Sequence, residues 1–162
     1  MPIFKQINEV KYGSKTQTRR IAKNNEQLIT VDGVKRIVTT LKNGKTRLKW
    51  EVGRDYAIKP SMYEKGIETH RIRVTDLREE CVQDISEADA IAEGVKFRDL
   101  SIQLDIAIKC YLDYSSGDFI YPTARTSYQT LWDSINLTPK RNRWKANPKV
   151  WVIVFEVFEV TQ

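Results

Sequence analysis

The chain has 162 residues, enough for one domain with a single core, and its 27 Lys and Arg exceed its 21 Asp and Glu by six. A single histidine, His70, and two cysteines, Cys81 and Cys110, exclude a multi-histidine metal site, a cysteine zinc site and a disulfide framework. The longest apolar run, Val150–Phe155, is too short to cross a membrane, and the N-terminus lacks the apolar stretch of a signal peptide, so we expect a soluble, cytoplasmic protein without metal or cofactor.

The first predicted element is a short helix that ends near Tyr12. Ile3, Ile7 and Val10 lie at helical spacing, and Gly13 is a residue at which helices commonly stop. The residues after it, Ser14–Arg20, are expected to form a basic loop.

A β-meander is predicted over residues 28–52. The dipeptides Asp32-Gly33 and Asn43-Gly44 separate runs of β-branched and apolar residues, and both dipeptides accept the positive φ angles of two-residue hairpin turns. Further strands are expected over Tyr56–Lys59, closed by Pro60, and over Glu68–Thr75.

The C-terminal half is predicted to contain three helices and a final strand. Ser86 and Asp89 form a capping-box pattern, which predicts a helix to about Glu93 with a stop at Gly94. Two apolar stripes predict two more helices: Leu100, Leu104, Ile108 and Tyr111, then Tyr128, Leu131, Trp132 and Ile135. The segment Val150–Val160 reads as a buried strand, so the fold class is α+β, a small β-sheet or barrel with helical insertions.

Charge is segregated along the chain. Residues 1–59 carry 14 Lys and Arg against 5 Asp and Glu, whereas residues 60–134 carry 8 against 14. A basic N-terminal third favours an anionic partner such as nucleic acid, and a mixed solvated surface is the alternative.

Six motifs follow one another in an order that resembles a known domain. They are Gly13–Arg20, Trp50–Tyr56, Leu77–Glu80, Asp84–Val95, Leu131–Asn136 and Trp144–Ile153. Together they resemble the ASCH domain of the PUA-like superfamily, in the form encoded by bacteriophages and prophages. The resemblance implies one PUA-like β-barrel domain over residues 1–162, with a β-meander inserted at about 28–52 and helices inserted at about 98–136. PUA-like domains generally bind RNA or modified nucleic acid.

The loop Gly13–Arg20 is also similar to that of one bacterial ASCH subfamily, a small amidohydrolase that removes the acetyl group from N(4)-acetylcytidine nucleosides. The resemblance implies that Lys15 and Thr18 occupy its catalytic lysine and threonine positions and that Arg20 matches its arginine. It places Glu93 at the catalytic glutamate, at the same interval after the helix start Ile85–Glu87. The chain is longer than that subfamily by the two insertions, which leaves the substrate open.

Amide hydrolysis without metal or histidine needs a nucleophile, a proton carrier and a group that stabilises the anion. In one interpretation Glu93 takes a proton from Thr18 or water while Lys15 stabilises the oxyanion. In another, a desolvated Lys15 is the base and Glu93 contacts the base edge of the ligand. The same side chains also suit a binding site, with cations on phosphate and Glu93 on a cytosine amino group.

Other candidates for phosphate or nucleic-acid binding are Thr16, Arg19, Arg143 and Trp144. Trp144 is either a stacking platform for a base or packed core, and the loop at Lys15 is either a site or a solvated basic loop. Glu93 has an alternative as an ordinary residue of the last helical turn.

The leading hypothesis is binding of RNA, a modified nucleoside or single-stranded nucleic acid in a basic cleft lined by Lys15, Thr18, Arg20 and Glu93. The alternative is a metal-independent enzyme that uses the same residues, either an amidohydrolase acting on an acylated cytidine or a ribonuclease. A third hypothesis is a phage structural or regulatory protein with a vestigial cleft.

Overall fold

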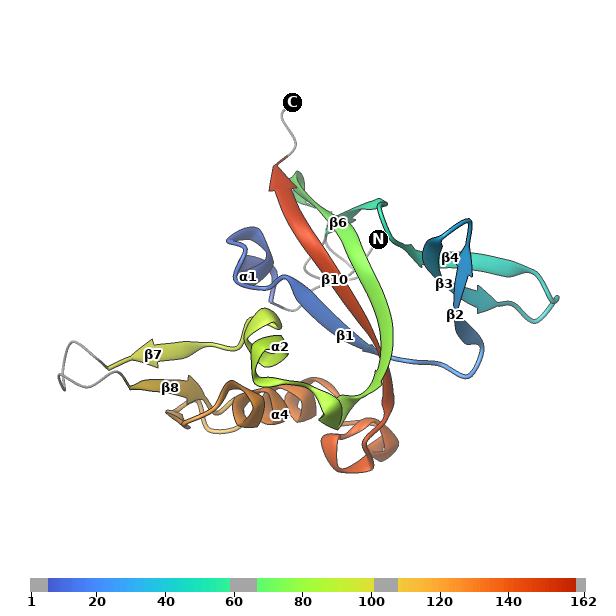
Figure 1. Cartoon of the computed structure of the whole chain (residues 1–162). Coiled ribbons are helices and arrows are strands. Elements are labelled where there is room, and N and C mark those ends of the chain that lie inside the picture. Colours follow the sequence, from blue (N-terminus) through green and yellow to red (C-terminus); the bar gives the residue numbers. More distant parts are fainter. Residues whose placement is uncertain (1–5, 59–66, 101–107, 160–162) are drawn as a thin grey trace. The chain divides into compact units, whose positions relative to one another are not determined.

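The structure is a computed structural model that describes residues 6–58, 67–100 and 108–159 (Figure 1). It is α+β, and six of its strand pairings are antiparallel. The chain divides into two compact units: unit 1 combines Met1–Glu80 with Lys149–Gln162, and unit 2 is Cys81–Pro148. In sequence, unit 2 is therefore inserted between two segments of unit 1.

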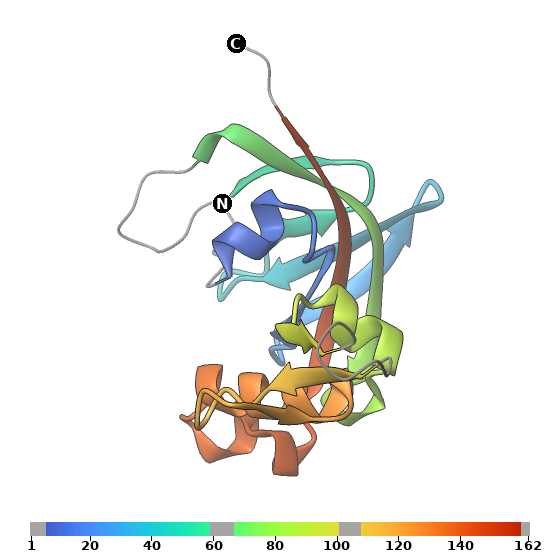
Figure 2. The same ribbon diagram turned by 90° about the vertical axis from the view of Figure 1, so that its left-hand side faces the viewer.

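Unit 1 is built on a four-stranded sheet with the order β1-β10-β6-β5. Its strands are β1 (Gln17–Ile21), β10 (Lys149–Glu159), β6 (Ile67–Cys81) and β5 (Asp55–Ile58). Figure 1 and Figure 2 show the long strands β6 and β10 side by side along much of their length. The predicted C-terminal strand is confirmed, and its pattern of buried residues explains its density of β-branched side chains.

The predicted meander is confirmed as a three-stranded sheet in unit 1. Its strands are β2 (Glu26–Val31), β3 (Val34–Thr40) and β4 (Thr46–Glu51). Asp32 and Gly33 have φ angles of 52° and 75°, and Gly44 has a φ of 77°. Asp32-Gly33 thus has the two left-handed residues of the predicted two-residue turn. The two-residue turn predicted at Asn43-Gly44 is wrong: only Gly44 is left-handed, and the connection runs from the end of β3 at Thr40 to the start of β4 at Thr46.

One hydrophobic core holds the sheets of unit 1 and the N-terminal helix α1 (Ile7–Lys11) together. Its buried members are Val10, Ile37, Trp50, Ile58, Ile72, Val74, Leu77, Trp151, Ile153 and Phe155. Burial of each large side chain stabilises the fold by about 1.5–3 kcal/mol. The helix ends at Lys11 with Tyr12 as its C-cap, close to the predicted end, and Gly13 follows with a φ of 74°. Ile3, which was predicted to belong to this helix, lies outside the described residues.

Unit 2 joins short helices to a small antiparallel sheet with the order β7-β8-β9. Its elements are η1 (Val82–Asp84), α2 (Glu87–Ala92), β7 (Phe97–Asp99), β8 (Lys109–Leu112), β9 (Phe119–Tyr121), α4 (Ala124–Ile135), η2 (Lys140–Asn142) and η3 (Trp144–Ala146). The predicted helix after Ser86 is confirmed, because the Ser86 hydroxyl accepts from the amide of Asp89 at 3.1 Å and Glu93 is the C-cap of the helix. The stripe from Tyr128 to Ile135 lies in α4 as predicted.

The helix predicted over Leu100–Tyr111 is wrong at its described ends, while residues 101–107 lie outside the described residues. Phe97 pairs with Tyr111 in the β7–β8 ladder, and the amide of Leu100 donates to the carbonyl of Ile108 at 2.9 Å. At these described ends, pairing between β7 and β8 outweighed the helical spacing of the apolar residues.

Two boundaries also differ from the prediction, and a third, at Lys59, lies outside the described residues. The basic loop is shorter, because Gln17–Ile21 is a strand, and β6 continues past Thr75 to Cys81. The strand predicted to end at Lys59 is described only to Ile58. Across the residues that the structure describes, no helix is long and apolar enough to cross a membrane.

Candidate functional site

The segment from Lys15 to Arg20 is held between α1 and β10. The amide of Lys15 donates to the carbonyl of Glu9 in α1 at 2.9 Å, and the amide of Phe155 in β10 donates to the carbonyl of Thr16 at 2.9 Å. From Gln17 onward the segment is an edge strand of the four-stranded sheet, paired with β10. The backbone that carries the candidate residues is therefore fixed by hydrogen bonds on both sides.

Most side chains of this segment are withdrawn from solvent. Lys15, Thr18 and Arg19 are each 5 % exposed, and Gln17 is 3 % exposed. Lysine and arginine are among the residues that are least often buried, because removing a charge from water is costly unless it is paired. A solvated basic loop would leave these side chains in water, so their burial argues against that alternative.

The strand register sorts the candidates onto two faces of the sheet. Thr18 pairs with Ile153 and Arg20 with Trp151, so these two candidates share the face of the core residues. Arg19 pairs with Val152 and points to the opposite face. Adjacent residues of the motif thus have different surroundings.

Arg19 is part of a hydrogen-bonded network with residues of β6. Its Nη2 donates to Glu80 Oε2 at 2.9 Å, and Arg78 donates to the other oxygen of Glu80 at 2.5 Å and to Gln17 at 3.4 Å. The side chain of Arg19 is fully buried and that of Glu80 is 20 % exposed. A phosphate on Arg19 would have to displace Glu80, so Arg19 joins β1 to β6 in this structure.

Glu93 belongs to unit 2, where it is the C-cap of α2 and is 2 % exposed. Its amide donates to the carbonyl of Asp89 at 2.9 Å, and Gly94 follows with a φ of 79°. Gly94 ends the helix as predicted, so the local backbone of Glu93 follows from the sequence. The burial of Glu93 argues against an ordinary exposed residue of the last turn, because carboxylates are seldom buried without a role or a partner.

Trp144 is packed inside unit 2. It is 8 % exposed, its ring lies 5.6 Å from the guanidinium of Arg125, and its centroid is 6.3 Å from that of Tyr128 in an edge-on contact. Its neighbour Arg143 donates to the carbonyl of Leu137 at 3.0 Å. These contacts favour the packed-core alternative for Trp144, because a stacking base needs an open ring face.

Unit 1 thus brings together Lys15, Thr16, Thr18, Arg19 and Arg20 on one strand and the loop before it. Glu93, Arg143 and Trp144 belong to unit 2. The joint action of Glu93 with Lys15 stays a prediction. Within the described ranges, no group of three or more His, Cys, Asp and Glu side chains is arranged to hold a metal ion.

A buried carboxylate, Glu26, was not anticipated from the sequence. It accepts from the indole Nε1 of Trp151 at 2.7 Å and from Lys49 Nζ at 2.6 Å, and its side chain is 2 % exposed. Burial raises the pKa of Glu26, but the hydrogen bonds from Lys49 and Trp151 more than offset it, so the pKa lies below its usual value. The alternation of β2 was the available signal, since Glu26 stands two residues before the half-buried Leu28.

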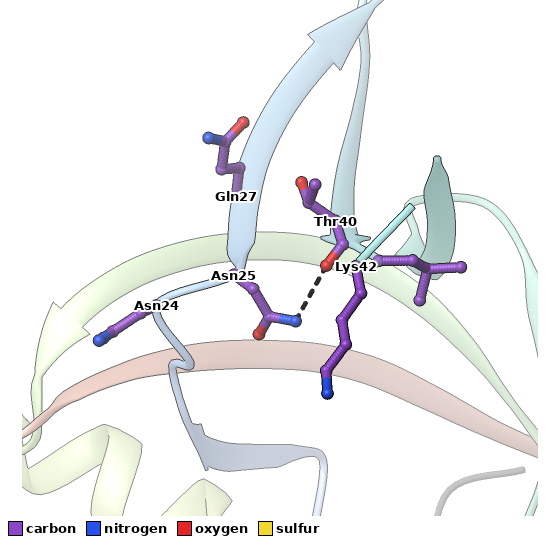
Figure 3. A pocket seen from close by; sticks show the side chains of 6 residues that line it. Asn24, Asn25, Gln27, Thr40 and Lys42 are labelled. Atoms are coloured by element: carbon purple, nitrogen blue, oxygen red, sulfur yellow. Dashed lines mark hydrogen bonds between the residues drawn. The ribbon is translucent and has the colours of Figure 1, made fainter. Parts of the chain in front are cut away.

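A hollow lined mostly by polar residue types lies at one end of the meander (Figure 3). It is lined by Asn24, Asn25, Gln27, Thr40, Leu41 and Lys42. The Asn25 Nδ2 donates to the carbonyl of Thr40 at 3.0 Å, the bond drawn in Figure 3. None of these residues was singled out in the sequence, because exposed Asn and Lys near a turn are ordinary turn residues.

Comparison of the chain with protein-family models, with curated proteins and with solved structures finds no match.

Proposed function

We propose that this chain binds RNA, a modified nucleoside or another single-stranded nucleic acid, and that the Lys15–Arg20 segment, apart from the Glu80-paired Arg19, is its principal anion-binding segment. The proposal follows the resemblance of the motifs to ASCH and PUA-like domains, together with the α+β architecture, which suits a small β-rich domain of that kind. A PUA-like barrel with an inserted meander and inserted unit 2 elements is part of the same proposal.

The observation that carries it is the withdrawal of Lys15 and Thr18 from solvent, each at 5 % exposure, on a backbone fixed by α1 and β10. Holding an ammonium group out of water costs free energy that a solvated loop would not incur. Because the backbone of the segment is already ordered, an anion does not have to order it on binding, so the segment suits recognition of one charged ligand.

The distribution of charge supports an anionic partner. Unit 1 contains 19 Lys and Arg against 12 Asp and Glu, a net of +7, whereas unit 2 contains 8 against 9, a net of −1. The basic character of the chain therefore resides in the unit that carries Lys15 and Arg20. A field of this sign attracts polyanions and speeds their association.

The binding experiment measures fluorescence anisotropy of a labelled single-stranded RNA at low and moderate salt. We expect Lys15→Met and Arg20→Gln each to weaken binding about tenfold, with a shallower salt dependence. Lys11→Gln, which removes the same charge four residues away on α1, is the matched control. Equal binding by all three variants would reject the proposal and favour a structural or regulatory protein with a vestigial cleft.

A second candidate function is hydrolysis, and the burial of Glu93 at 2 % exposure favours keeping it. In this proposal Thr18 or a water is the nucleophile, Lys15 and Glu93 share the stabilising and proton-transfer roles, and an acylated cytidine or an RNA phosphodiester is the substrate. Hydrolysis requires Glu93 to act together with Lys15.

Turnover is tested by release of acetate from N(4)-acetylcytidine and, in parallel, by cleavage of labelled RNA. We expect Glu93→Gln and Lys15→Met to lower any turnover at least a hundredfold, with the double variant no worse than the single ones, because residues that act as a unit are not additive. Exposed Glu156→Gln is the control. Absence of both reactions in the native chain, with RNA binding intact, would leave binding as the function.

A further inference from the structure

One end of the meander is strongly basic, and its cations are separate from those of the Lys15–Arg20 segment. Three exposed cations, Lys42, Lys45 and Arg47, lie in and just after the β3–β4 turn, and we call them the basic end. The hollow of Figure 3, lined by Asn24, Asn25, Gln27, Thr40, Leu41 and Lys42, adjoins it and is called here the carboxamide hollow.

The strand register explains why these residues meet. Glu26 pairs with Thr39 and Thr40 with Thr46, so the entry to β2 and the β3–β4 turn lie at the same end of the sheet. The amide of Thr40 donates to the carbonyl of Asn25 at 2.8 Å, and that of Leu41 to the carbonyl of Lys45 at 2.8 Å. The hollow and the turn are thus joined by backbone hydrogen bonds.

The two ends of the meander use their cations differently. At the β2–β3 end, Lys35 is paired with Asp76 at 2.7 Å, and Arg36 is paired with Glu51. In the part of the chain that the structure describes, no carboxylate forms an ion pair with Lys42, Lys45 or Arg47. Three like charges within six residues repel one another, and a bound anion would relieve this repulsion.

The carboxamide hollow supplies a different chemistry. The side chains of Asn24 and Gln27 make no hydrogen bond to any described residue, so each retains a planar donor and acceptor pair. Such a pair matches the edges of nucleobases, which are accessible in unpaired strands. Leu41, 37 % exposed, adds an apolar surface against which a base can pack.

We propose that this end of the meander is a binding site for single-stranded nucleic acid, with the basic end on the phosphates and the carboxamide hollow on the base edges. This inference does not rest on the proposed role of Lys15, because it concerns other residues of unit 1. It gives the meander a role as a second contact surface, in addition to the Lys15 segment.

The test uses the full chain and labelled single-stranded oligonucleotides, with binding followed by anisotropy as salt is varied. We expect Lys42→Gln/Lys45→Gln to weaken binding about tenfold and to reduce the slope of log affinity against log salt by about 1.4, because single strands lose about 0.7 per phosphate contact. Asn24→Ala/Gln27→Ala is expected to weaken binding at least threefold without changing that slope.

The matched control is Lys35→Gln/Arg36→Gln, which removes two cations from the opposite end of the same sheet. If this control weakens binding as much as Lys42→Gln/Lys45→Gln, general charge attraction explains the data and the site is rejected. Equal affinity for duplex, with no effect of Asn24→Ala/Gln27→Ala, would also overturn the assignment of base contacts. Circular dichroism of each variant confirms that the fold is retained. The affinity of Lys15→Met, measured in the same assay, distinguishes the contribution of the Lys15 segment from that of the basic end.

Discussion

At the scale of single residues, Glu26 is a buried carboxylate that is hydrogen-bonded to two different strands of unit 1. It accepts from the indole of Trp151, a core residue of β10, and from Lys49 of β4. Hydrogen bonds to a charged acceptor contribute more to the free energy of folding than neutral ones do. Removal of one partner leaves a buried polar group without its hydrogen bond, which destabilises the fold. Glu26 therefore connects the meander to the four-stranded sheet.

The lowered pKa of Glu26 predicts that unit 1 loses stability in acid. A carboxyl whose folded pKa lies below its ordinary value of 4.5 contributes stability above that value and loses it as the pH falls through the folded pKa. Urea unfolding should show a free energy of unfolding that falls below about pH 4.5. Glu26→Gln should reduce this fall, while Glu156→Gln, at an exposed position of β10, should not. An unchanged pH dependence in Glu26→Gln would contradict the assignment.

At the scale of elements, the N-terminus of α4 is capped by a residue from another helix. The two carboxylate oxygens of Glu87 accept from the amides of Ala124 and Arg125 at 2.6 Å and 3.0 Å. Thr123, the N-cap residue of α4 itself, accepts from the amide of Thr126 through its side chain. A carboxylate at a helix N-terminus satisfies free amides and interacts favourably with the helix dipole. Glu87 therefore fixes α4 against α2.

Removal of this cap should loosen α4. We expect Glu87→Ala to destabilise the helix by about 1–2 kcal/mol, since a lost cap costs about 1 kcal/mol and the dipole contributes a little less. Glu87→Gln should destabilise α4 less than Glu87→Ala does, because an amide oxygen still accepts a hydrogen bond but carries no charge. Hydrogen exchange of the first amides of α4 measures the effect, with exposed Asp118→Asn as the control. Equal protection in Glu87→Ala and the native chain would show that the cap is dispensable.

At the scale of the whole molecule, unit 1 consists of two separate segments of the chain, whereas unit 2 is a single segment. Unit 2 is contiguous, and its ends are close together, because the amide of Val82 donates to the carbonyl of Pro148 at 3.0 Å. On the side of unit 1, Lys149 pairs with Glu79 at 2.7 Å, and β6 neighbours β10 in the sheet. The chain thus leaves and re-enters unit 1 at nearly the same point.

Replacement of residues 81–148 by an Asn-Gly turn should therefore leave unit 1 folded. A two-residue turn suits neighbouring strands with adjacent ends. The remaining tryptophans, Trp50 and Trp151, are 5 % and 2 % exposed, so their emission should stay blue-shifted and should change in one cooperative urea transition. The variant should keep binding by the basic end and lose any turnover that needs Glu93. Red-shifted emission without a transition would show that unit 1 requires unit 2.

The sequence predicted those parts of the fold that depend on local chemistry. Positive φ at Asp32 and Gly33 set the β2–β3 hairpin, and the Ser86 hydroxyl set the start of α2. These signals are carried by neighbouring residues, so they do not depend on the rest of the chain. The Lys15–Arg20 motif was likewise visible at once, but its functional role remains a prediction.

Tertiary structure alone decided the features that join distant segments. The apolar stripe that ends at Tyr111 has a helical period, yet Tyr111 pairs with Phe97 in the β7–β8 ladder. Hydrogen bonds between strands decide this pairing, and a local pattern of apolar residues does not reveal them. Similarly, Arg19 reads as one of six polar residues in a basic segment, but Glu80, 61 residues away, determines that it is buried and paired. The sequence by itself determined where this chain turns and where it is basic. Long-range pairing decided which of its charges join distant segments and which, at the basic end, have no carboxylate partner among the described residues.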